Sequence, residues 1–408
     1  MSIETAVVVG AGHAGVELVH SLRKDGFEGR VVLVSAEPEF PYQRPPLSKD
    51  FLKGGGTNLL LLKAEALYEK MGIELMRGRH VEEIDRDARL VRLDGGETIG
   101  YDRLALATGA RNRRPPIPGL DDPVVLELRD LADSRRILER LDGLDRVAVI
   151  GAGFIGLEIA AFLAGKGKHV EVVELASRVM ARAVSEPISD YFLAHHRGMG
   201  TTIRLETGVT EIVHRGDNSV QVVLSDGSAI DAAAVLLAAG VVPNVELAVA
   251  AGLEVNDGIV VDEFLRTSDP AIAALGDCAS FPCAYLGGDY VRLESVQNAN
   301  DQARLIAKQW MGAEAPYTAL PWFWSHQGEA RLQIAGLGLG YDQTVLRGDP
   351  AEHKFSVFLY RGGKLIAVES LNASADHMAA RKLIEKGTNV PPETAADPAT
   401  ELKKLIVK

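Results

Sequence analysis

The chain has 408 residues, of which 47% are hydrophobic and 25% charged, so it is long enough for two or three globular domains with large cores. Its net charge of −12 argues against non-specific binding of nucleic acid. The apolar run at 232–242 is too short to cross a bilayer, and we expect no signal peptide before the first predicted strand. With only two cysteines, the composition predicts a reduced, cytoplasmic protein without a disulfide framework.

The first predicted elements are a strand, a glycine-rich turn and a helix. An apolar run at 6–9 leads into the sequence GAGHAG at 10–15, and the predicted helix ends at Gly26. A β-rich run at 30–34 follows, with Glu37 just beyond it. This order is typical of a dinucleotide-binding unit, in which the glycines allow a tight turn, close approach of a pyrophosphate, and close helix–strand packing.

The same order returns in the middle of the chain. A strand at 146–150 leads into GAGFIG at 151–156, and a second strand at 169–173 is followed at once by Glu174. The helix between them is predicted to turn three apolar side chains inward: Ile155, Ile159 and Phe162. One such glycine pattern is a weak signal, but two in the same strand–turn–helix setting indicate two nucleotide sites.

A second echo indicates an internal duplication, because LALATG at 104–109 resembles VLLAAG at 235–240. The fold class is therefore predicted to be α/β, with two Rossmann-like domains and a C-terminal α+β domain. The predicted boundaries give one dinucleotide-binding domain in two parts, 1–113 and 245–320, a second inserted at 114–244, and the C-terminal domain at 321–408. The Pro-rich tail at 387–400 is predicted to be loose, ahead of a short terminal helix.

The acid after the second unit's strand carries the choice of cofactor. Glu174 would accept hydrogen bonds from a ribose diol and repel a 2′-phosphate, which favours NADH over NADPH. Arg178 and Arg182 lie close by, and they leave two readings open. Their guanidinium groups could serve a phosphate, or they could be solvated surface charges.

Several longer strings carry a family resemblance: ATG at 107–109, ALGD at 274–277, PYQRPPLSK at 41–49, LESVQNA at 293–299 and PWFWS at 321–325. With both glycine loops, they resemble the flavoproteins that have two dinucleotide-binding domains. More narrowly, the chain resembles the FAD-dependent ferredoxin reductases of bacterial haem-thiolate monooxygenases and aromatic-ring-hydroxylating dioxygenases. The resemblance implies FAD in the first unit, NADH in the inserted unit, and a separate [2Fe–2S] ferredoxin as electron acceptor.

For FAD, the resemblance implies a set of residues drawn from most of these strings: Gly10, Gly12, Ala14, Gly15, Glu37, Arg44, Pro45, Lys49, Val81, Thr108, Gly109, Arg129, Gly276, Asp277, Val296 and Trp324. Pro45 and Trp324 would pack near the isoalloxazine ring, and Lys49 would lie close to its hydride-accepting nitrogen. Glu37 departs from the pattern, because many relatives place the ribose acid one residue earlier, where this chain has Ala36.

For NADH, the implied set is Gly151, Gly153, Ile155, Gly156, Glu158, Glu174, Arg182 and Gly240. Glu158 and Lys49 are the predicted catalytic residues, since in relatives this acid contacts the nicotinamide amide and pairs with the lysine. Simpler interpretations stay open for both. A carboxylate near a helix N-terminus is stabilised by the helix dipole alone, and Lys49 could be an ordinary surface lysine.

Other redox chemistry is not predicted. Cys278 and Cys283 have the spacing of the pair in flavin disulfide reductases, but that class carries its cysteines where this chain has RPPLSK at 44–49. Two cysteines cannot hold an iron–sulfur cluster, so the acceptor must be external. The ten histidines show no metal-ligand spacing, and His195–His196 is predicted to lie at a helix surface or boundary.

An acidic ferredoxin would dock on basic residues. Arg304 and Lys308 share a helix face at i and i+4 and are the first choice; the cluster of Arg111, Arg113 and Arg114 is the second. All of them could equally be solvated surface charges. Two alternative functions stay open: a rubredoxin, small-quinone or monodehydroascorbate reductase of the same fold, and a flavoprotein of the apoptosis-inducing-factor type.

Overall fold

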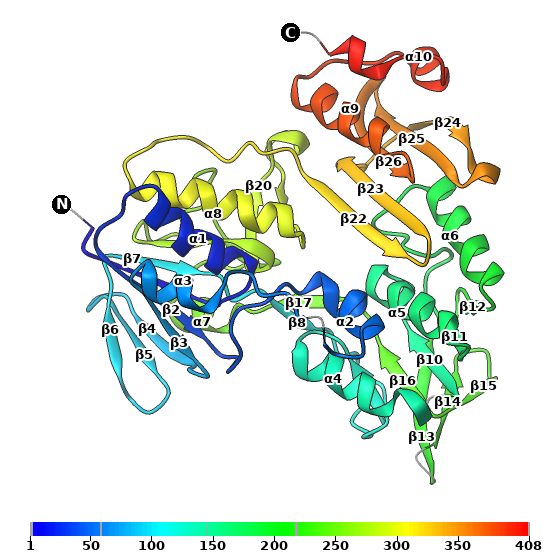
Figure 1. The fold of residues 1–408 in the computed structure, drawn as a ribbon, viewed down its shortest axis with the longest axis horizontal. Coiled ribbons are helices and arrows are strands. Elements are labelled where there is room, and N and C mark those ends of the chain that lie inside the picture. The colour runs from blue at the N-terminus through cyan, green and yellow to red at the C-terminus, as the bar shows by residue number, and fades with distance from the viewer. Residues whose placement is uncertain (1–2, 58, 144, 217–218, 407–408) are drawn as a thin grey trace. The chain divides into compact units, whose positions relative to one another are not determined.

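A computed structural model describes residues 3–57, 59–143, 145–216 and 219–406 (Figure 1). The chain forms two compact units. Unit 1 comprises Met1–Arg44, Leu59–Arg111 and Val242–Pro321. Unit 2 comprises Pro45–Asn58, Asn112–Val241 and Trp322–Lys408. Strands β8 (Ala110–Asn112) and β17 (Val241–Pro243) contain two of the points where the chain passes from one unit to the other.

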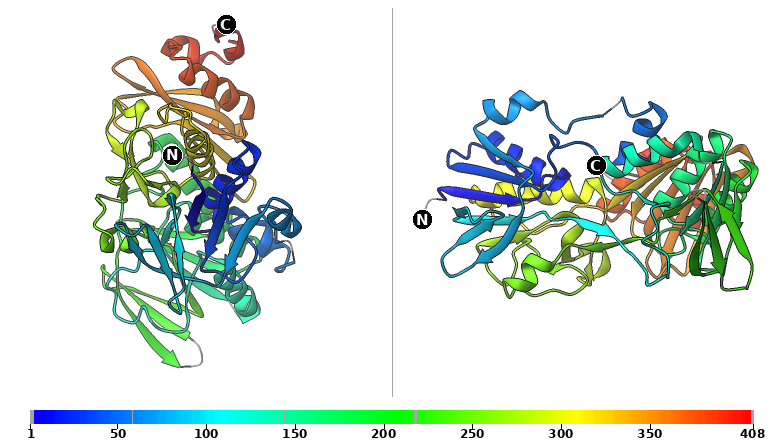
Figure 2. Two further views of the ribbon diagram at one scale, coloured as in Figure 1. Left: turned by 90° about the vertical axis from the view of Figure 1, so that its left-hand side faces the viewer. Right: turned by 90° about the horizontal axis from the view of Figure 1, so that it is seen from below.

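Unit 1 is built on a parallel sheet with the strand order β19-β7-β1-β2-β3. Its strands are β1 (Thr5–Val9), β2 (Arg30–Ser35), β3 (Ile73–Arg77), β7 (Arg103–Leu106) and β19 (Ile272–Ala274). The helices α1 (His13–Lys24) and α8 (Val296–Trp310) pack against each other (Figures 1 and 2). Residues 6–9 of β1 are buried because both faces of a central parallel strand are covered.

Smaller elements complete unit 1. The helices α3 and α7 span Glu65–Lys70 and Glu246–Ala250. An antiparallel sheet joins β4 (Val81–Asp85), β5 (Leu90–Leu93) and β6 (Thr98–Gly100), and a further sheet joins β18 (Ile259–Val260), β20 (Ala279–Pro282) and β21 (Tyr290–Val291).

Unit 2 repeats the parallel arrangement, with the strand order β12-β11-β10-β16-β9. Its strands are β9 (Val125–Glu127), β10 (Arg146–Ile150), β11 (His169–Val173), β12 (Thr202–Arg204) and β16 (Ala234–Leu237). Its helices are α2 (Asp50–Lys53), α4 (Leu131–Arg140), α5 (Phe154–Gly165) and α6 (Glu186–Gly198). A three-stranded antiparallel sheet joins β13 (Val209–Gly216), β14 (Ser219–Leu224) and β15 (Ala229–Ala232).

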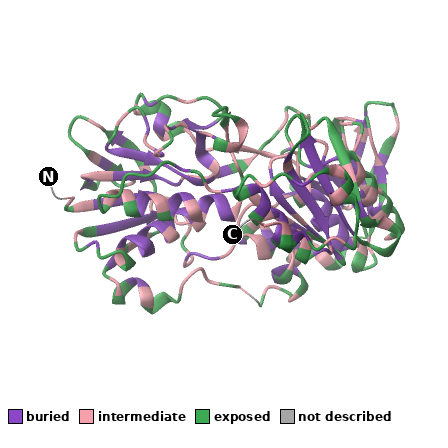
Figure 3. Ribbon diagram, turned by 90° about the horizontal axis from the view of Figure 1, so that it is seen from above, coloured by how far each residue is buried: buried purple, intermediate pink, exposed green. Residues whose placement is uncertain are grey.

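The C-terminal part of unit 2 is an antiparallel sheet with the order β22-β23-β26-β25-β24, covered by α9 (Figure 1). Its elements are β22 (Trp322–Gln327), β23 (Ala330–Gly336), β24 (Gln343–Asp349), β25 (Lys354–Arg361), β26 (Lys364–Leu371), α9 (Ser374–Glu385) and α10 (Pro392–Ala396). Ile188 and Phe192 of α6 share one buried cluster with Leu332 and Phe355 of this sheet, and Figure 3 shows the buried strands. Among the described residues, no helix has the length and apolar character needed to span a membrane.

The predicted duplication is confirmed by matching registers in the two parallel sheets. The Gly10 N–H donates to Val34 O at 2.9 Å, and the Gly151 N–H donates to Val173 O at 2.8 Å. In both units the first glycine therefore follows the central strand and is tied to the end of the next strand. The predicted α/β class, with two Rossmann-like sheets and a C-terminal α+β part, is correct.

One helix face differs from its prediction. Ile159 and Phe162 of α5 are buried as expected, but Ile155 is 44% exposed. It lies in the first turn of α5, beside the glycine loop, so the helical period does not bring it over the sheet. The inward orientation predicted for Ile155 is wrong.

The predicted loose tail is also wrong. Residues of this segment form α10, and Ala395 is fully buried. The reason is Arg347, which is 8% exposed and whose guanidinium donates to the carbonyl oxygens of Ala395, Pro398 and Thr400. A buried guanidinium with five donors needs such acceptors, and it fixes the segment that supplies them. The terminal helix is a single 3₁₀ turn, Leu402–Leu405.

Candidate functional site

The glycine loop of unit 1 is shaped by backbone contacts that exclude side chains. A Cβ atom on Gly10, whose φ is +107°, would lie 2.2 Å from the carbonyl oxygen of Ala107. A Cβ on Gly15 would lie 1.9 Å from the carbonyl oxygen of Gly10. Gly12, by contrast, faces open space, with no atom within 4 Å of its Cβ position. The loop is thus closed toward the protein and open above the N-terminus of α1, which suits a bound anion.

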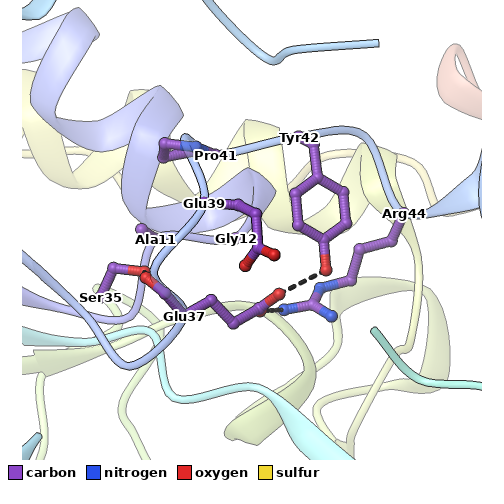
Figure 4. A pocket seen from close by; sticks show the side chains of 8 residues that line it. All are labelled: Ala11, Gly12, Ser35, Glu37, Glu39, Pro41, Tyr42 and Arg44. Atoms are coloured by element: carbon purple, nitrogen blue, oxygen red, sulfur yellow. Dashed lines mark hydrogen bonds and ion pairs between the residues drawn. The ribbon is translucent and has the colours of Figure 1, made fainter. Parts of the chain in front are cut away.

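A small pocket adjoins this open side of the loop (Figure 4). Its lining residues are Ala11, Gly12, Ser35, Glu37, Glu39, Pro41, Tyr42 and Arg44. The Glu37 carboxylate accepts hydrogen bonds from the Tyr42 hydroxyl and from the Arg44 guanidinium, the latter at 2.5 Å. The structure therefore brings two predicted FAD residues, Glu37 and Arg44, together beside Gly12.

Other predicted FAD residues of unit 1 surround the same loop. Gly276, with φ +75°, lies against Ala14, since its Cβ would be 3.2 Å from the Ala14 Cβ. Burial and the nearby Arg44 lower the pKa of His13 to about 4, although the Asp277 charge acts in the opposite direction. His13, Asp277 and Arg44 are therefore electrostatic neighbours at the start of α1.

The remaining predicted FAD residues are more scattered. The Thr108 hydroxyl donates to Asn244 O at 2.7 Å, which fixes the turn that contains Gly109. Val296 begins α8, and Val81 begins β4 without lining the pocket. Four predicted FAD residues belong to unit 2 instead: Pro45, Lys49, Arg129 and Trp324.

The glycine loop of unit 2 repeats the geometry of the first. A Cβ on Gly151, with φ +104°, would lie 2.4 Å from the carbonyl oxygen of Ala238. A Cβ on Gly156 would lie 2.2 Å from the carbonyl oxygen of Gly151, and Gly153 faces open space. The three glycines play the same three parts in both units, so the second loop fits a dinucleotide diphosphate equally well.

The acid of unit 2 is held rigidly by backbone donors. The Glu174 carboxylate accepts the N–H of Ala152, within the glycine loop, at 2.7 Å, and the N–H of Ala176 at 2.8 Å. The next side chain, Leu175, is 77% exposed, an unusual position for a large apolar group. A fixed carboxylate beside an exposed apolar side chain suits the ribose and adenine of a nucleotide.

The two nearby arginines have different surroundings. The Arg178 guanidinium donates to Val184 O at 2.7 Å and to Ala181 O at 2.6 Å, so its donors are engaged in holding a loop. Arg182 lies beside Gly240, whose Cβ position is 3.4 Å from the arginine Nη2. Arg182 and Gly240, both predicted to bind NAD, are therefore neighbours.

The predicted catalytic pair is formed within unit 2. Lys49 Nζ lies 2.6 Å from Glu158 Oε2, and the side chains are 15% and 3% exposed. Ser48 Oγ donates to the same oxygen at 2.6 Å, and Ser325 Oγ donates to Oε1 at 2.7 Å. The interpretation of Lys49 as an ordinary surface lysine is therefore wrong.

Ser48 and Ser325 are site residues that sequence reasoning did not single out. Both lie in strings that carry the resemblance, directly beside Lys49 and Trp324. The strings therefore contain both serines, but no local pattern indicates a contact with a residue more than a hundred positions away. Trp324 is half-buried on β22, with its ring centroid 5.4 Å from that of Trp322.

The predicted docking residues are exposed but largely neutralised. Arg304 forms ion pairs with Glu17 at 2.7 Å and with Asp301 at 3.0 Å. Lys308 is exposed one turn further along α8. In the second cluster, Arg111 pairs with Glu246 at 2.8 Å, Arg113 is exposed, and Arg114 pairs with Asp121 at 2.7 Å. A compensated arginine contributes less to a basic surface than its formal charge suggests.

Both cysteines, and one histidine of the pair predicted at a helix surface or boundary, are buried. Cys278 and Cys283 are buried free thiols, and burial raises the pKa of both. No group of three potential metal-ligating side chains occurs among the residues that the structure describes. His195 and His196 lie in the last turn of α6, at the predicted helix boundary, but His196 is fully buried rather than at the surface, and its Nε2 lies 2.8 Å from Gln327 Oε1.

Two family matches cover most of the chain. Residues 4–303 match the family described as pyridine nucleotide-disulphide oxidoreductase, and residues 322–406 match the family described as reductase C-terminal. The chain therefore belongs to the pyridine nucleotide-disulphide oxidoreductase family.

The similar proteins cover the whole chain. Rhodocoxin reductase of Rhodococcus erythropolis is 46% identical over 98% of this chain and 94% of its own length. The crystal structure of the ferredoxin reductase for the CYP199A2 system from Rhodopseudomonas palustris has a TM-score of 0.96 at 48% identity, covering 99% of this chain and 100% of that one. The reductase in the covalent putidaredoxin reductase–putidaredoxin complex has a TM-score of 0.95 at 38% identity, covering 100% and 99%.

Proposed function

We propose that this protein is an FAD-dependent NADH:ferredoxin oxidoreductase that serves an oxygenase. The observation that carries the proposal is the presence of two equivalent dinucleotide loops. The second loop leads into the helix that carries Glu158, the partner of Lys49. The similar proteins named above are reductases of ferredoxin-type partners, which supports the same activity here. The oxygenase that receives the electrons is a haem-thiolate monooxygenase or a ring-hydroxylating dioxygenase.

Each half of the molecule is proposed to bind one nucleotide. FAD is held by the Gly10–Gly15 loop together with Glu37, Arg44, Gly276 and Asp277, in a domain formed by residues 1–113 and 245–320. NADH is held by the Gly151–Gly156 loop of an inserted domain at 114–244, and residues 321–408 form the C-terminal domain. When bound, the flavin supplies the essential redox chemistry: it accepts a hydride from NADH and releases electrons singly.

The side chains of unit 2 give the reaction its orientation and specificity. Glu174, fixed by the N–H groups of Ala152 and Ala176, accepts the ribose hydroxyl groups of NADH and repels a 2′-phosphate. Glu158 is proposed to accept a hydrogen bond from the nicotinamide amide. Lys49 pairs with that buried carboxylate and supplies a compensating charge at 2.6 Å.

The electron acceptor is proposed to be a separate [2Fe–2S] ferredoxin. The two buried free cysteines cannot supply the four ligands that such a cluster needs. Arg304 and Lys308 on α8 are the proposed docking residues, with Lys308 exposed and Arg304 in two ion pairs. Free thiols are also expected of a reducing compartment, so we propose a cytoplasmic location.

The deciding experiment follows electrons through the purified holoenzyme. Anaerobic mixing with NADH should bleach the flavin absorbance. Cytochrome c, added as the final acceptor, should then be reduced only when a [2Fe–2S] ferredoxin is also present. If rubredoxin, a small quinone or monodehydroascorbate were reduced without ferredoxin as fast as ferredoxin itself is reduced, the other reductases of this fold would be favoured. Slow NADH oxidation with a long-lived charge-transfer band would favour a flavoprotein of the apoptosis-inducing-factor type.

A further inference from the structure

Glu158 is supported from the C-terminal sheet as well as from the segment that contains Lys49. Strand β22 alternates its side chains, so Phe323, Ser325 and Gln327 share one face and Trp322 and Trp324 the other. Ser325 and Gln327 are fully buried. The face they share is therefore directed into unit 2.

This strand face matches one face of helix α5. Phe154 and Glu158 are four residues apart and so lie on the same side of the helix. Phe154 packs against Phe323, with ring centroids 4.6 Å apart, and Glu158 Oε1 accepts the Ser325 hydroxyl at 2.7 Å. Two apposed pairs, one aromatic and one polar, fix the strand against the helix at the height of the carboxylate.

Behind Ser325, a chain of donors runs toward Glu158. Burial lowers the pKa of His196 to about 4, so its ring is neutral at pH 7, and its Nε2–H donates to Gln327 Oε1 at 2.8 Å. Gln327 Nε2 then donates to Ser325 Oγ at 3.3 Å. The serine hydroxyl proton is left to point at the carboxylate, because its oxygen already accepts a donor.

The same geometry limits what else Glu158 can bind. A carboxylate offers about four acceptor positions. Within the described residues Oε2 accepts Lys49 and Ser48, whereas Oε1 accepts Ser325 alone. Oε1 therefore keeps one position for an N–H donor, which is what a nicotinamide carboxamide carries.

We propose that Ser325, oriented by Gln327 and His196, is a positioning residue that fixes Glu158 Oε1 for the nicotinamide. The C-terminal domain thereby takes part in hydride transfer as well as contributing Trp324. This inference rests on the proposed function, because it assumes that Glu158 contacts the nicotinamide.

The test compares Ser325→Ala with Ser356→Ala, a matched control. Ser356 is also fully buried in the C-terminal sheet and also bonds a serine and a carboxylate, namely Ser370 and Asp376, but it does not contact Glu158. Loss of a hydrogen bond to a buried charge should slow the limiting rate of flavin reduction in single turnover by about 5- to 20-fold in Ser325→Ala. The NADH dissociation constant should change by less than about twofold, because Glu174 and the glycine loop hold the other end of the nucleotide.

An equilibrium measurement isolates the nicotinamide without any turnover. NAD⁺ and ADP-ribose share every group except nicotinamide, so the ratio of their affinities for the oxidised holoenzyme reports the nicotinamide contact alone. We expect Ser325→Ala to lower this ratio by up to about twofold, in keeping with the small change in the NADH dissociation constant, and Ser356→Ala to leave it unchanged. Should Ser325→Ala fold poorly, Ser325→Cys keeps the side-chain size with a weaker donor and should give an intermediate ratio.

A double-mutant cycle shows whether Ser325 acts through Glu158. In a Glu158→Gln background, Ser325→Ala should have little further effect on either readout, because the two residues form one contact. Unchanged rate and affinity ratio in Ser325→Ala, or the same loss in the Glu158→Gln background, would overturn the inference. Failure of the proposed function would be distinguished from failure of this inference by the wild-type protein, whose flavin would then not be reduced by NADH at all.

Discussion

The two glycine loops share their backbone geometry but differ in how each acid is held. In unit 2, Glu174 directly follows the strand and is fixed by two backbone N–H groups, one of them inside the loop. In unit 1, the register places Ser35 at the equivalent position, and Glu37 lies two residues later, held by the side chains of Tyr42 and Arg44. One duplicated unit thus holds its acid rigidly, which suits the proposed selection of NADH, whereas the other surrounds its pocket with longer side chains, which suits the proposed retention of FAD.

The largest expected effects come from filling the open position in each loop. Gly12 and Gly153 have φ near −75° and −79°, so alanine fits the backbone, but its methyl group would occupy the space above the helix N-terminus. Gly12→Ala should give folded protein with at least about tenfold weaker FAD binding, a loss of about 1.4 kcal/mol. Gly153→Ala should retain FAD and weaken NADH binding by a similar factor. Flavin content and NADH titration measure both.

Gly165→Ala is the matched control for these variants. Gly165 lies in α5, also with no atom within 4 Å of its Cβ position, and alanine is the better helix former. It should leave both nucleotides bound. If Gly12→Ala kept its FAD while Gly153→Ala lost it, the assignment of the two loops would be reversed.

A second experiment changes the rigid acid of unit 2. Replacing Glu174 by Ala and adding an arginine at Leu175 should raise the NADPH-to-NADH ratio of kcat/KM by about tenfold or more, because the repulsion of a 2′-phosphate is removed. Arg178→Ala should leave that ratio unchanged, since its guanidinium holds the carbonyl groups of Ala181 and Val184. Equal use of NADPH and NADH by the wild type would contradict the role of Glu174.

A third prediction concerns the carboxylate that joins the C-terminal sheet to α6 in unit 2. Glu369 is 2% exposed and accepts the Ser185 N–H at 3.0 Å, and burial raises its pKa from 4.5 to about 7. The folded state therefore holds a proton that the unfolded state loses above pH 4.5. Stability from this group is present below pH 4.5 and falls as the pH rises toward about 7, by an amount on the order of 3 kcal/mol, since each pKa unit corresponds to about 1.4 kcal/mol.

Glu369→Gln removes this titration. Its Tm should fall less between pH 5 and pH 8 than the wild-type Tm does. The Tm can be measured by tryptophan fluorescence, to which Trp322 and Trp324 of the same sheet contribute. Glu352→Gln, an exposed site in this domain, should follow the wild type. Identical slopes for Glu369→Gln and wild type would show that Glu369 does not titrate in this range.

The smallest effect is expected at the proposed dock on unit 1. Arg304→Glu should slow ferredoxin reduction several-fold at low ionic strength, and the loss should shrink as salt screens the charges, since a rim ion pair contributes about 0.2–1 kcal/mol. Ferricyanide reduction should change little. Arg79→Glu is the control, because Arg79 also pairs with two acids, Asp94 and Glu97, in unit 1. Equal losses in both variants would place the dock elsewhere.

Local patterns predict the parts of this molecule that local sequence determines. The strand–glycine–helix order predicts both parallel sheets and both loops, because the hydrophobic period and the glycine spacing are features of segments of about 25 residues. The inward orientation predicted for Ile155 is wrong because a helical period does not show where the helix extends beyond the sheet. The tail was misjudged because its order comes from Arg347, some fifty residues earlier.

The candidate site shows the same limit. The Lys49–Glu158 pair was predicted only through a resemblance, and Ser325, which lies 167 residues from Glu158, was not predicted at all. Buried polar contacts of this kind depend on how a strand and a helix are juxtaposed in the folded chain. Neither hydrophobic period nor residue type at one position contains that information.

The proposed function requires that electrons pass from NADH through this protein to a [2Fe–2S] ferredoxin. The most direct measurement is anaerobic stopped-flow reduction of the FAD-loaded protein by one equivalent of NADH, followed by mixing with oxidised ferredoxin. We predict bleaching of the flavin and then its reoxidation, with two ferredoxins reduced for each NADH consumed. A flavin that NADH does not reduce, or a reduced flavin that ferredoxin does not reoxidise, would contradict the account.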